Sequence, residues 1–282
     1  MRKSWITLGV LLAGVIALGL FAWLKPPKAP VVTYVLSTIK PADVRTVRVL
    51  RKGKPLATLE KSATDWRLTE PVAAPAEEFQ ALRLIAILDA KSAQQYPAAD
   101  RAKFELDVPQ YEIVVNDQRF AFGAINTVTR EQYVLTESRI FPVAMNYGAA
   151  VPTDVAALLR KTVLAPGDTP VRFEFATFSL EYQTNKWVAT PPAVDLSQDD
   201  FNRWVAQWRD GSGLRTEFVG GAAKTPKPIG QVLITLKSGG KVSLDILQSE
   251  PELIVRRTDL GLQFVFTGNI GKQMLSPPVA RK

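Results

Sequence analysis

The amino-acid sequence predicts an α+β fold: an N-terminal transmembrane helix followed by two tandem, mutually similar modules of mostly antiparallel sheet with packed helices. Three observations predict it. An uncharged stretch near the N-terminus is as long as a membrane span. Short alternating segments between turn residues are typical of antiparallel strands. The stretch DWRLTEPVAAPAEEFQALR at 65–83 resembles KWVATPPAVDLSQDDFNRWV at 186–205, which indicates an internal repeat.

The first part, residues 1–28, is predicted to hold a cytoplasmic tip, the membrane anchor and a spacer. The 20 residues from Trp5 to Leu24 carry no charge, and Trp5 and Trp23 stand near their ends, where indole rings favour the membrane interface. A cleaved signal peptide is the alternative, but such peptides have shorter apolar cores and small residues at the cleavage site. The stretch therefore favours an uncleaved single-pass anchor.

The charge pattern bears on location and partners. Half of the net charge of +8 lies in residues 1–28, and the remaining chain is nearly balanced, so we expect no nucleic-acid surface. The basic N-terminal tip and the lack of any later apolar span favour a short cytoplasmic N-terminus and an exported body. The absence of cysteine is compatible with an oxidising compartment.

The first module is predicted to span residues 29–165. Its alternating residues predict strands at 44–51, 55–61 and 66–68. Pro75 is expected to open a helix, because the first helical turn does not need its missing N–H group. The apolar stripe of this helix is expected to consist of Phe79, Leu82, Ile85 and Leu88.

The second module, predicted to span residues 166–282, repeats this order. Strands are expected within 171–183 and at 187–189, and Ser197 is expected to begin a helix in a near capping box with Asp200. Gly211 is expected to end that helix. The residues expected to be equivalent in the two copies are Trp66 and Trp187, Pro71 and Pro192, and Phe79 and Phe201.

The second half of each module is predicted to contain two hairpins and a helix. The hairpins of the first copy lie at 111–123 and 131–145, and those of the second at 231–247 and 252–267. Helical pieces are expected to close the copies at 153–164 and 269–275.

The four tryptophans of the repeated stretches have two interpretations each. Trp66 and Trp187 are expected in the core, with stacking on a sugar as the alternative. Trp204 and Trp208 follow Phe201 at helical spacing and are also expected in the core, with an exposed partner surface as the alternative.

No catalytic, metal-ligating or cofactor-binding residue is predicted. The chain has no histidine and no cysteine, which removes the commonest general base, metal ligand and thiol nucleophile. The carboxylates Glu77, Glu78, Asp195, Asp199 and Asp200 stand at helix starts, where the helix dipole explains them. Enzymatic activity is not expected, since it would need a buried carboxylate pair that the sequence does not indicate.

The first module carries further motifs. They are WRLTEP at 66–71, Tyr96-Pro97, the box FELDVP at 104–109, and the strands ending at Phe122-Gly123 and at Tyr133-Val134. In these motifs the chain resembles the bacterial family called domain of unknown function 4340, whose box has Gly where Glu105 stands here. The resemblance covers residues 40–165 well and 170–275 weakly. It implies an anchored or exported envelope protein, in some cases associated with transporter-like gene products, and transfers no catalytic residues.

Together with the resemblance, these features favour a periplasmic, non-enzymatic interaction or scaffold protein that is anchored by a single pass in the bacterial inner membrane. It is expected to be accessory to a transporter or envelope-assembly complex, with a protein partner docking on its sheet edges. The alternative function is binding of a lipid or glycan in a cleft between the modules, rimmed by 163–170 and 211–230.

Overall fold

The computed structural model describes residues 12–16, 18–20, 32–63, 65–193, 196–219 and 226–278. Residues 12–16 and 18–20 are helical and exposed. Among the described residues, no helix has both the length and the apolar character of a membrane span. Trp5, Trp23 and much of the predicted 5–24 anchor lie outside the described residues, as do Asp195 and part of the 211–230 loop.

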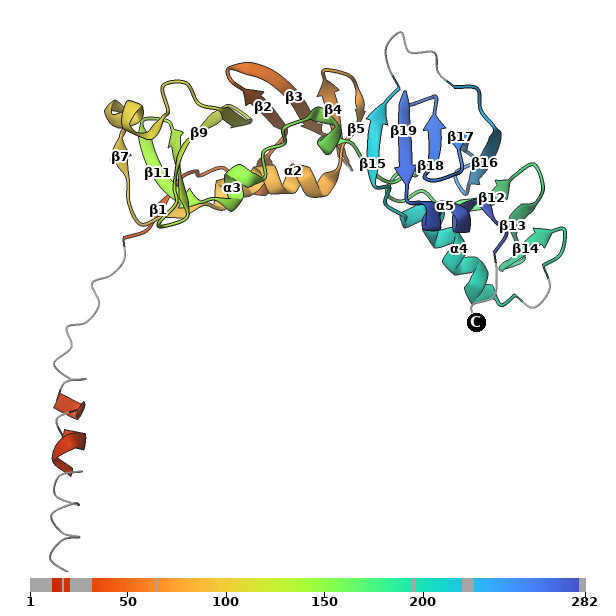
Figure 1. Cartoon of the computed structure of the whole chain (residues 1–282), viewed down its shortest axis with the longest axis horizontal. Helices are drawn as coiled ribbons and strands as arrows, with labels where there is room; N and C mark the ends of the chain where they lie inside the picture. The colour runs from red at the N-terminus through yellow and green to blue at the C-terminus, as the bar shows by residue number, and fades with distance from the viewer. Residues whose placement is uncertain are drawn as a thin grey trace, which may run out of the picture.

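Two large antiparallel sheets with a few helices form the body, which confirms the predicted α+β class (Figure 1). In the first sheet the strand order is β5-β4-β3-β2-β8-β9-β10-β11-β7. The strands are β2 (Thr46–Arg51), β3 (Lys54–Lys61), β4 (Trp66–Glu70), β5 (Ala74–Pro75), β7 (Tyr96–Pro97), β8 (Tyr111–Val115), β9 (Gln118–Asn126), β10 (Glu131–Thr136) and β11 (Arg139–Ala144). A separate two-stranded sheet pairs β1 (Tyr34–Val35) with β6 (Lys91–Ser92).

In the second sheet the strand order is β14-β13-β12-β16-β17-β18-β19-β15. The strands are β12 (Pro170–Glu174), β13 (Ser179–Gln183), β14 (Lys186–Thr190), β15 (Arg215–Phe218), β16 (Gly230–Leu236), β17 (Lys241–Gln248), β18 (Leu253–Arg257) and β19 (Leu262–Phe266). All four predicted hairpins are present, since β8 pairs with β9, β10 with β11, β16 with β17 and β18 with β19.

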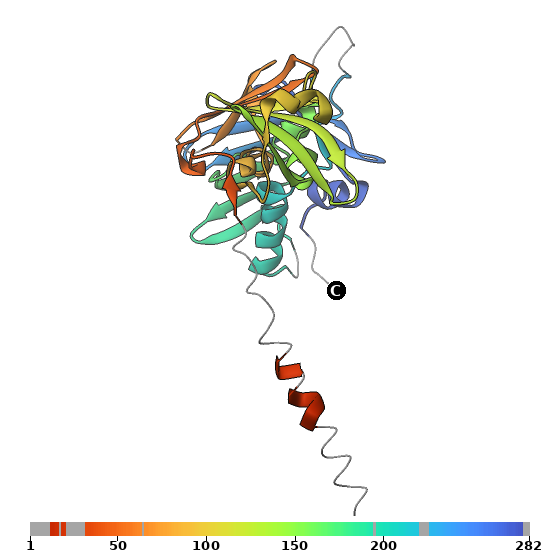
Figure 2. The ribbon, with the colours of Figure 1, turned by 90° about the vertical axis from the view of Figure 1, so that its left-hand side faces the viewer.

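The helices cover one side of both sheets, the lower side in Figure 1, and the end-on view in Figure 2 shows α4 below the strands. The α-helices are α2 (Glu78–Ile85), α3 (Asn146–Ala149), α4 (Gln198–Asp210) and α5 (Gly268–Leu275). Four short 3₁₀ turns complete the described elements: η1 (Pro41–Asp43), η2 (Ala86–Asp89), η3 (Ala98–Phe104) and η4 (Val155–Leu158). The prediction of a helix over 153–164 is wrong beyond η4, because the chain from Leu159 onward is extended and pairs with both sheets.

Seven strands follow the same order in the two sheets. The series β4-β3-β2-β8-β9-β10-β11 of the first sheet corresponds to β14-β13-β12-β16-β17-β18-β19 of the second. The flanking strands differ, since β5 and β7 border the first series and β15 borders the second.

A β-bulge explains why the spacing of the two copies changes along the chain. Trp66 and Trp187 stand 121 residues apart, but Glu70 and Thr190, which end β4 and β14, stand 120 apart. Thr69 is the extra residue, because Leu68 pairs with Leu59 and Glu70 pairs with the adjacent Thr58. The strand β14 pairs with β13 without such an irregularity.

Because of this bulge, the predicted equivalence of Pro71 and Pro192 is wrong. The residue that directly follows β14, as Pro71 follows β4, is Pro191. Both prolines follow a cis peptide bond and both are exposed. Pro192 is therefore one residue beyond the position of Pro71.

The predicted apolar stripe of the first helix is wrong at two positions. Phe79 and Leu82 are exposed, with 64% and 47% of their surface accessible. The face of α2 and η2 that packs on the sheet instead carries Ala81, Leu84, Ile85 and Leu88. Counted from the residue before each helix, these positions match the buried Phe201, Trp204, Val205 and Trp208 of α4. Phe201 is thus equivalent to Ala81, and Phe79 is not its counterpart.

The helix α4 otherwise begins and ends as predicted. The Ser197 side chain accepts from the backbone N–H of Asp200, and the Asp200 carboxylate accepts from that of Ser197, which completes the capping box. Gly211 is the C-terminal cap.

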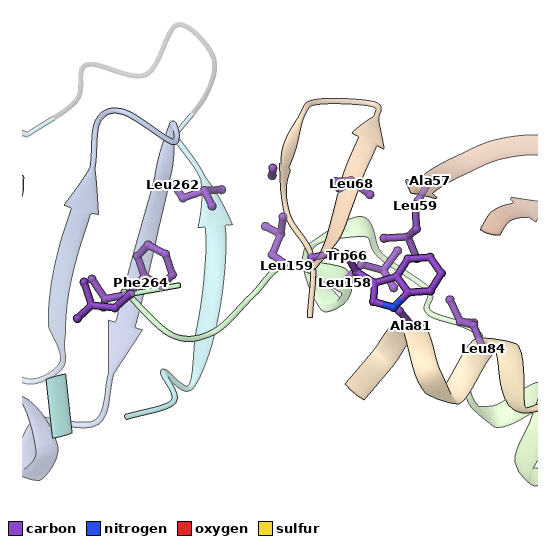
Figure 3. Packing of buried hydrophobic residues seen from close by; sticks show 14 of the residues in the cluster. Ala57, Leu59, Trp66, Leu68, Ala81, Leu84, Leu158, Leu159, Leu262 and Phe264 are labelled. Carbon is purple, nitrogen blue, oxygen red and sulfur yellow. The ribbon is translucent and has the colours of Figure 1, made fainter. Parts of the chain in front are cut away.

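One hydrophobic core runs through both sheets and the segment that joins them. Figure 3 shows Trp66, Leu68 and Leu84 on the side of the first sheet, Leu262 and Phe264 on the side of the second, and Leu158 and Leu159 between them. Because the buried side chains are contiguous, the two sheets are stabilised by one continuous hydrophobic core.

Candidate functional site at the joint between the sheets

The segment 158–163, here called the connector, lies between β5 of the first sheet and β15 of the second (Figure 1). Towards the first sheet it behaves as an added strand. The backbone N–H of Glu77 donates to Leu158 O at 2.7 Å, that of Arg160 donates to Pro75 O at 3.0 Å, and Leu159 forms an antiparallel bridge with Ala76. The connector therefore continues the first sheet beyond β5.

The same segment also pairs with the second sheet. The N–H of Gly213 donates to Lys161 O at 2.8 Å, and Thr162 forms an antiparallel bridge with Ser212. The Thr216 hydroxyl of β15 donates to the carbonyl of Arg160 at 2.8 Å, and Arg257 of β18 donates to the carbonyl of Val163 at 2.8 Å. Backbone polar groups that would be left bare at two sheet edges are thus paired with one shared strand.

Side chains of the connector strengthen this joint. Leu158 and Leu159 are buried in the common core. The guanidinium of Arg160, a residue with 8% of its surface exposed, forms a charge-assisted hydrogen bond with Asp65 just before β4. The backbone N–H of Lys161 donates to the Glu77 carboxylate at 3.2 Å. Arg160 hence joins the first sheet through its side chain and amide, and the second through its carbonyl.

The free edge of the second sheet is closed at Trp187 by a side chain. The Gln198 amide accepts from the N–H of Trp187 at 2.8 Å and donates to its carbonyl at 3.1 Å. In the first sheet the carbonyl of the equivalent Trp66 is bonded to the backbone instead, since the N–H of Ala76 donates to Trp66 O at 3.0 Å. Gln198 therefore replaces a neighbouring strand at this point.

The far edge of the first sheet is closed as well. Strand β7 pairs with the start of β11 through Tyr96 and Ile140. Further along β11, Pro142 has no N–H, and its carbonyl accepts from the buried Ser92 hydroxyl at 2.7 Å. At the positions named here, the edges offer few backbone groups for the β-strand addition expected from the sequence.

The tryptophans of the repeated stretches lie in the core. Trp66 and Trp187 are buried, in line with the interpretation preferred from the sequence. Trp204 and Trp208 are 5% and 0% exposed, and their indole N–H groups donate to carbonyls at the end of α5, from Gln273, Met274 and Ser276. The alternative that these two residues form a partner surface is wrong, because both side chains are buried, with their indole N–H groups bonded to the end of α5 and their rings packed on Phe173 and Phe175.

The FELDVP box at 104–109 of the first module packs on the outer face of its sheet. Phe104 and Leu106 lie against strands β9 to β11 with Tyr96 and Tyr133. Glu105 adopts the left-handed conformation, with φ of 57° and ψ of 35°, so the turn is made without glycine. A Cβ atom on Gly123 would stand 2.2 Å from the Phe104 carbonyl oxygen, which explains why the strand motif Phe122-Gly123 ends in a glycine.

This box borders an open groove of about 840 Å³. Its walls come from residues 38–39, the turn between β8 and β9, and the start of the turn after β10. Arg101 and Asp107 form an exposed ion pair at its rim. Beside it Arg119 pairs with Glu112, which is 1% exposed, and hydrogen bonding to Glu112 raises the pKa of Arg119.

A second hollow, of about 480 Å³, lies near the predicted inter-module cleft. It is lined by residues 162 and 164–169 together with Arg209 and Asp210 at the end of α4. Its lining therefore comes from the connector region and the second copy, and none of it from residues 32–161. Its lining includes Leu164, Ala165 and Pro166 but no aromatic side chain.

Two of the carboxylates singled out in the sequence have different roles in the structure. Asp200 belongs to the capping box, whose Ser197 hydrogen bonds lower the pKa of that carboxyl. Glu77 binds the connector. Across the described ranges, Glu112 is the one buried carboxylate, and no group of three acidic side chains is placed to hold a metal ion.

The joint is the part of this fold that the sequence does not reveal. Asp65 and Arg160 are 95 residues apart. Asp65 begins the repeated stretch at 65–83, but nothing in that stretch indicates Arg160 as its partner. Gln198 likewise reads as an ordinary helix residue. Only the apolar pair Leu158-Leu159 hints at burial, and it suits a helix equally well.

Comparison with known proteins identifies a family and nothing more specific. The family model described as Domain of unknown function (DUF4340) matches residues 66–227. No curated protein and no solved structure is significantly similar to this chain. The match begins at β4 and ends before β16, so it crosses the connector but omits β2 and β3 of the first sheet and β16 to β19 of the second. The match covers more than half of the chain, and the protein therefore belongs to the DUF4340 family.

Proposed function

We propose that this protein is a membrane-anchored, non-enzymatic interaction protein of the bacterial envelope, in which two copies of one module form a stiff arm. The observation that carries this proposal is the connector, which is paired with both sheets at once. Domains joined by a flexible linker move independently, whereas a shared strand fixes their relative orientation. A rigid, elongated body suits a protein that holds a partner at a set position.

The anchor of this arm is proposed from the sequence. Residues 5–24 would cross the inner membrane once, 1–4 would remain in the cytoplasm, and the body would lie in the periplasm. Sodium carbonate extraction of isolated membranes should leave the full-length protein in the pellet, and added protease should digest the body only after the outer membrane is opened. Release of the full-length protein by carbonate would contradict the anchor.

The partner is proposed to be another envelope protein that contacts faces of the sheets and not their edges. Strand addition is disfavoured at Trp187 and Pro142, where Gln198 and Ser92 already occupy the edge groups. The groove beside the box at 104–109 is open to such a contact. Its mixed charges, with Arg101, Asp107 and Arg119 at hand, suit a polar segment of the partner.

The test is crosslinking in whole cells followed by purification of the tagged full-length chain in detergent. A protein recovered in stoichiometric amount, and lost in a Thr38→Arg variant at an exposed residue that lines the groove, would support the proposal. Val128→Arg, at an exposed residue outside the groove, is the matched control. A monomer without stoichiometric partners in both cases would contradict it.

Binding of a lipid or glycan is the second candidate function, and the hollow beside the connector is the observation that favours it. Its mouth carries Arg209, Asp210 and Asp168, which suit polar head groups or sugar hydroxyls. Native mass spectrometry of the protein purified from its own membranes should then show a bound small molecule that is lost in Gly167→Trp. A spectrum of the bare chain would contradict this candidate.

A further inference from the structure

The outer face of α2 carries an exposed apolar pair. Phe79 and Leu82 are 64% and 47% exposed, and they stand three residues apart, so they share one face of the helix. The opposite face packs on the sheet through Ala81, Leu84 and Ile85. The guanidinium of Arg83 lies 6.0 Å from the centre of the Phe79 ring.

The second sheet provides an internal comparison, because α4 occupies the equivalent position there. Counted from the start of each helix, the counterparts of Phe79 and Leu82 are Asp199 and Asn202, and both are exposed. The counterpart of Arg83 is Arg203. The shared fold therefore does not require apolar residues on this face, and only the first copy has them.

The first copy is also the one next to the N-terminal apolar segment. Strand β1 pairs with β6, which follows η2 and α2 directly, and the N–H of Leu36 donates to Ala90 O. Only nine residues, 25–33, separate β1 from the end of the uncharged stretch at Leu24, a reach of at most about 30 Å. In Figure 1, β1 and α2 lie on the same lower side of the body. Val32 and Val35, at this entry point, are exposed as well.

We propose that the outer face of α2 rests on the lipid surface in which the N-terminal segment is anchored, with Phe79 and Leu82 in the interfacial region and Arg83 at the lipid phosphates. This inference rests on the proposed membrane anchor. Two apolar side chains bind a bilayer weakly by themselves. The anchor, however, holds them at a high effective concentration near the surface, so a weak contact can still set the orientation of the arm.

The absence of cysteine makes a direct test simple, since any introduced cysteine is the single labelling site. Full-length Leu82→Cys, Asn202→Cys and Val15→Cys variants would each carry a small fluorophore in nanodiscs of phosphatidylethanolamine and phosphatidylglycerol. Lipids bearing a nitroxide quench a fluorophore that touches them. Position 202 is the matched control on α4, and position 15 reports on the anchor.

The expected result is strong quenching at positions 15 and 82 and several-fold weaker quenching at position 202. Adding Phe79→Asp to Leu82→Cys, which installs the residue found in the second copy, should lower the quenching at 82 towards that at 202. Quenching at 15 with equal signals at 82 and 202 would overturn the α2 contact and leave the anchor intact, and α2 would then be free for a protein partner. No quenching at 15 would overturn the anchor and this inference together.

Discussion

At the scale of single residues, Glu105 shows how the box at 104–109 makes its turn with a residue that has a side chain. Its left-handed conformation costs a residue with a Cβ atom about 1–2 kcal/mol. Glycine would avoid this strain, but it loses more backbone entropy on folding, which destabilises the folded state by about 0.5–1 kcal/mol. Glu105→Gly should therefore stabilise the protein by about 0.5–1 kcal/mol, seen as a rise in Tm of about 2 °C. Ala102→Gly, within η3, is the control and should lower the Tm. A lower Tm for Glu105→Gly would show that its side chain has a stabilising contact.

Gly123 illustrates the opposite constraint, a position where no side chain fits. An added Cβ would meet the Phe104 carbonyl oxygen at 2.2 Å and Leu106 Cγ at 2.7 Å. Gly123→Ala should then destabilise the fold by about 1–3 kcal/mol in urea denaturation. Gly230→Ala, where the nearest atom is the mobile Cδ1 of Ile246 at 3.2 Å, should cost clearly less. Equal losses of stability in the two variants would contradict this constraint, because they would mean that the box at 104–109 shifts to make room for the added methyl group.

A third residue, Glu217 on β15, predicts how stability depends on pH. Hydrogen bonds from Arg215 and Gln263, each at 2.6 Å, stabilise its charged form and lower the pKa of its carboxyl. Its contribution is complete above the unfolded-state pKa of about 4.3 and is lost as the pH falls through the lower folded-state pKa. The Tm of Glu217→Gln should accordingly fall less than that of the wild type below about pH 4.3. Glu137→Gln, on an exposed turn, should follow the wild type, and parallel curves for all three proteins would refute the prediction.

At the scale of elements, the strands and hairpins could be predicted because alternation and turn residues are local signals. The turn Asn116-Asp117 correctly predicted the hairpin of β8 and β9, and Trp66 and Trp187 correctly marked the strands β4 and β14. The buried face of α2 could not be predicted in the same way. Phe79 and Leu82 satisfy a helical period as well as Ala81 and Leu84 do, and only the position of the sheet decides which set is covered.

The edges of the sheets were also beyond local prediction, since their closure depends on single distant side chains. Gln198→Ala should leave the N–H and carbonyl of Trp187 without partners and lower stability by about 1 kcal/mol. It should also raise the tendency to self-associate, because a bare edge accepts another strand. Urea denaturation and light scattering at increasing concentration would measure both effects. Gln231→Ala, whose amide binds only side chains on the sheet face, should change neither much, and an unchanged Gln198→Ala protein would contradict the role of the amide.

At the scale of the whole molecule, the connector links the two sheets through isolated β-bridges and a common core. This arrangement could not be read from the sequence, because an extended segment without alternation, 158–163, resembles the end of a helix. The predicted helix over 153–164 failed for this reason. Pairing with two sheets, contributed by residues as far apart as Pro75 and Gly213, overrode the local preference.

The joint makes a prediction about the shape of the body. Arg160→Met should remove the bond with Asp65 and cost about 2–3 kcal/mol, less than the roughly 3–5 kcal/mol of a fully buried pair because Asp65 is partly exposed. X-ray scattering should show a broader distribution of dimensions, as the sheets begin to move against each other. Arg209→Met, at an exposed ion pair, is the control and should change neither property. A double-mutant cycle with Asp65→Asn would show no coupling if the pair does not act as described.

The shared connector also limits how the chain can be divided. A piece that stops before Leu158 would leave β5 uncovered, and a piece that starts at Ala165 would leave β15 uncovered. Each half would then complete itself with strands from other molecules, and insoluble material would result. Neither copy is therefore expected to be soluble when it is produced without the other.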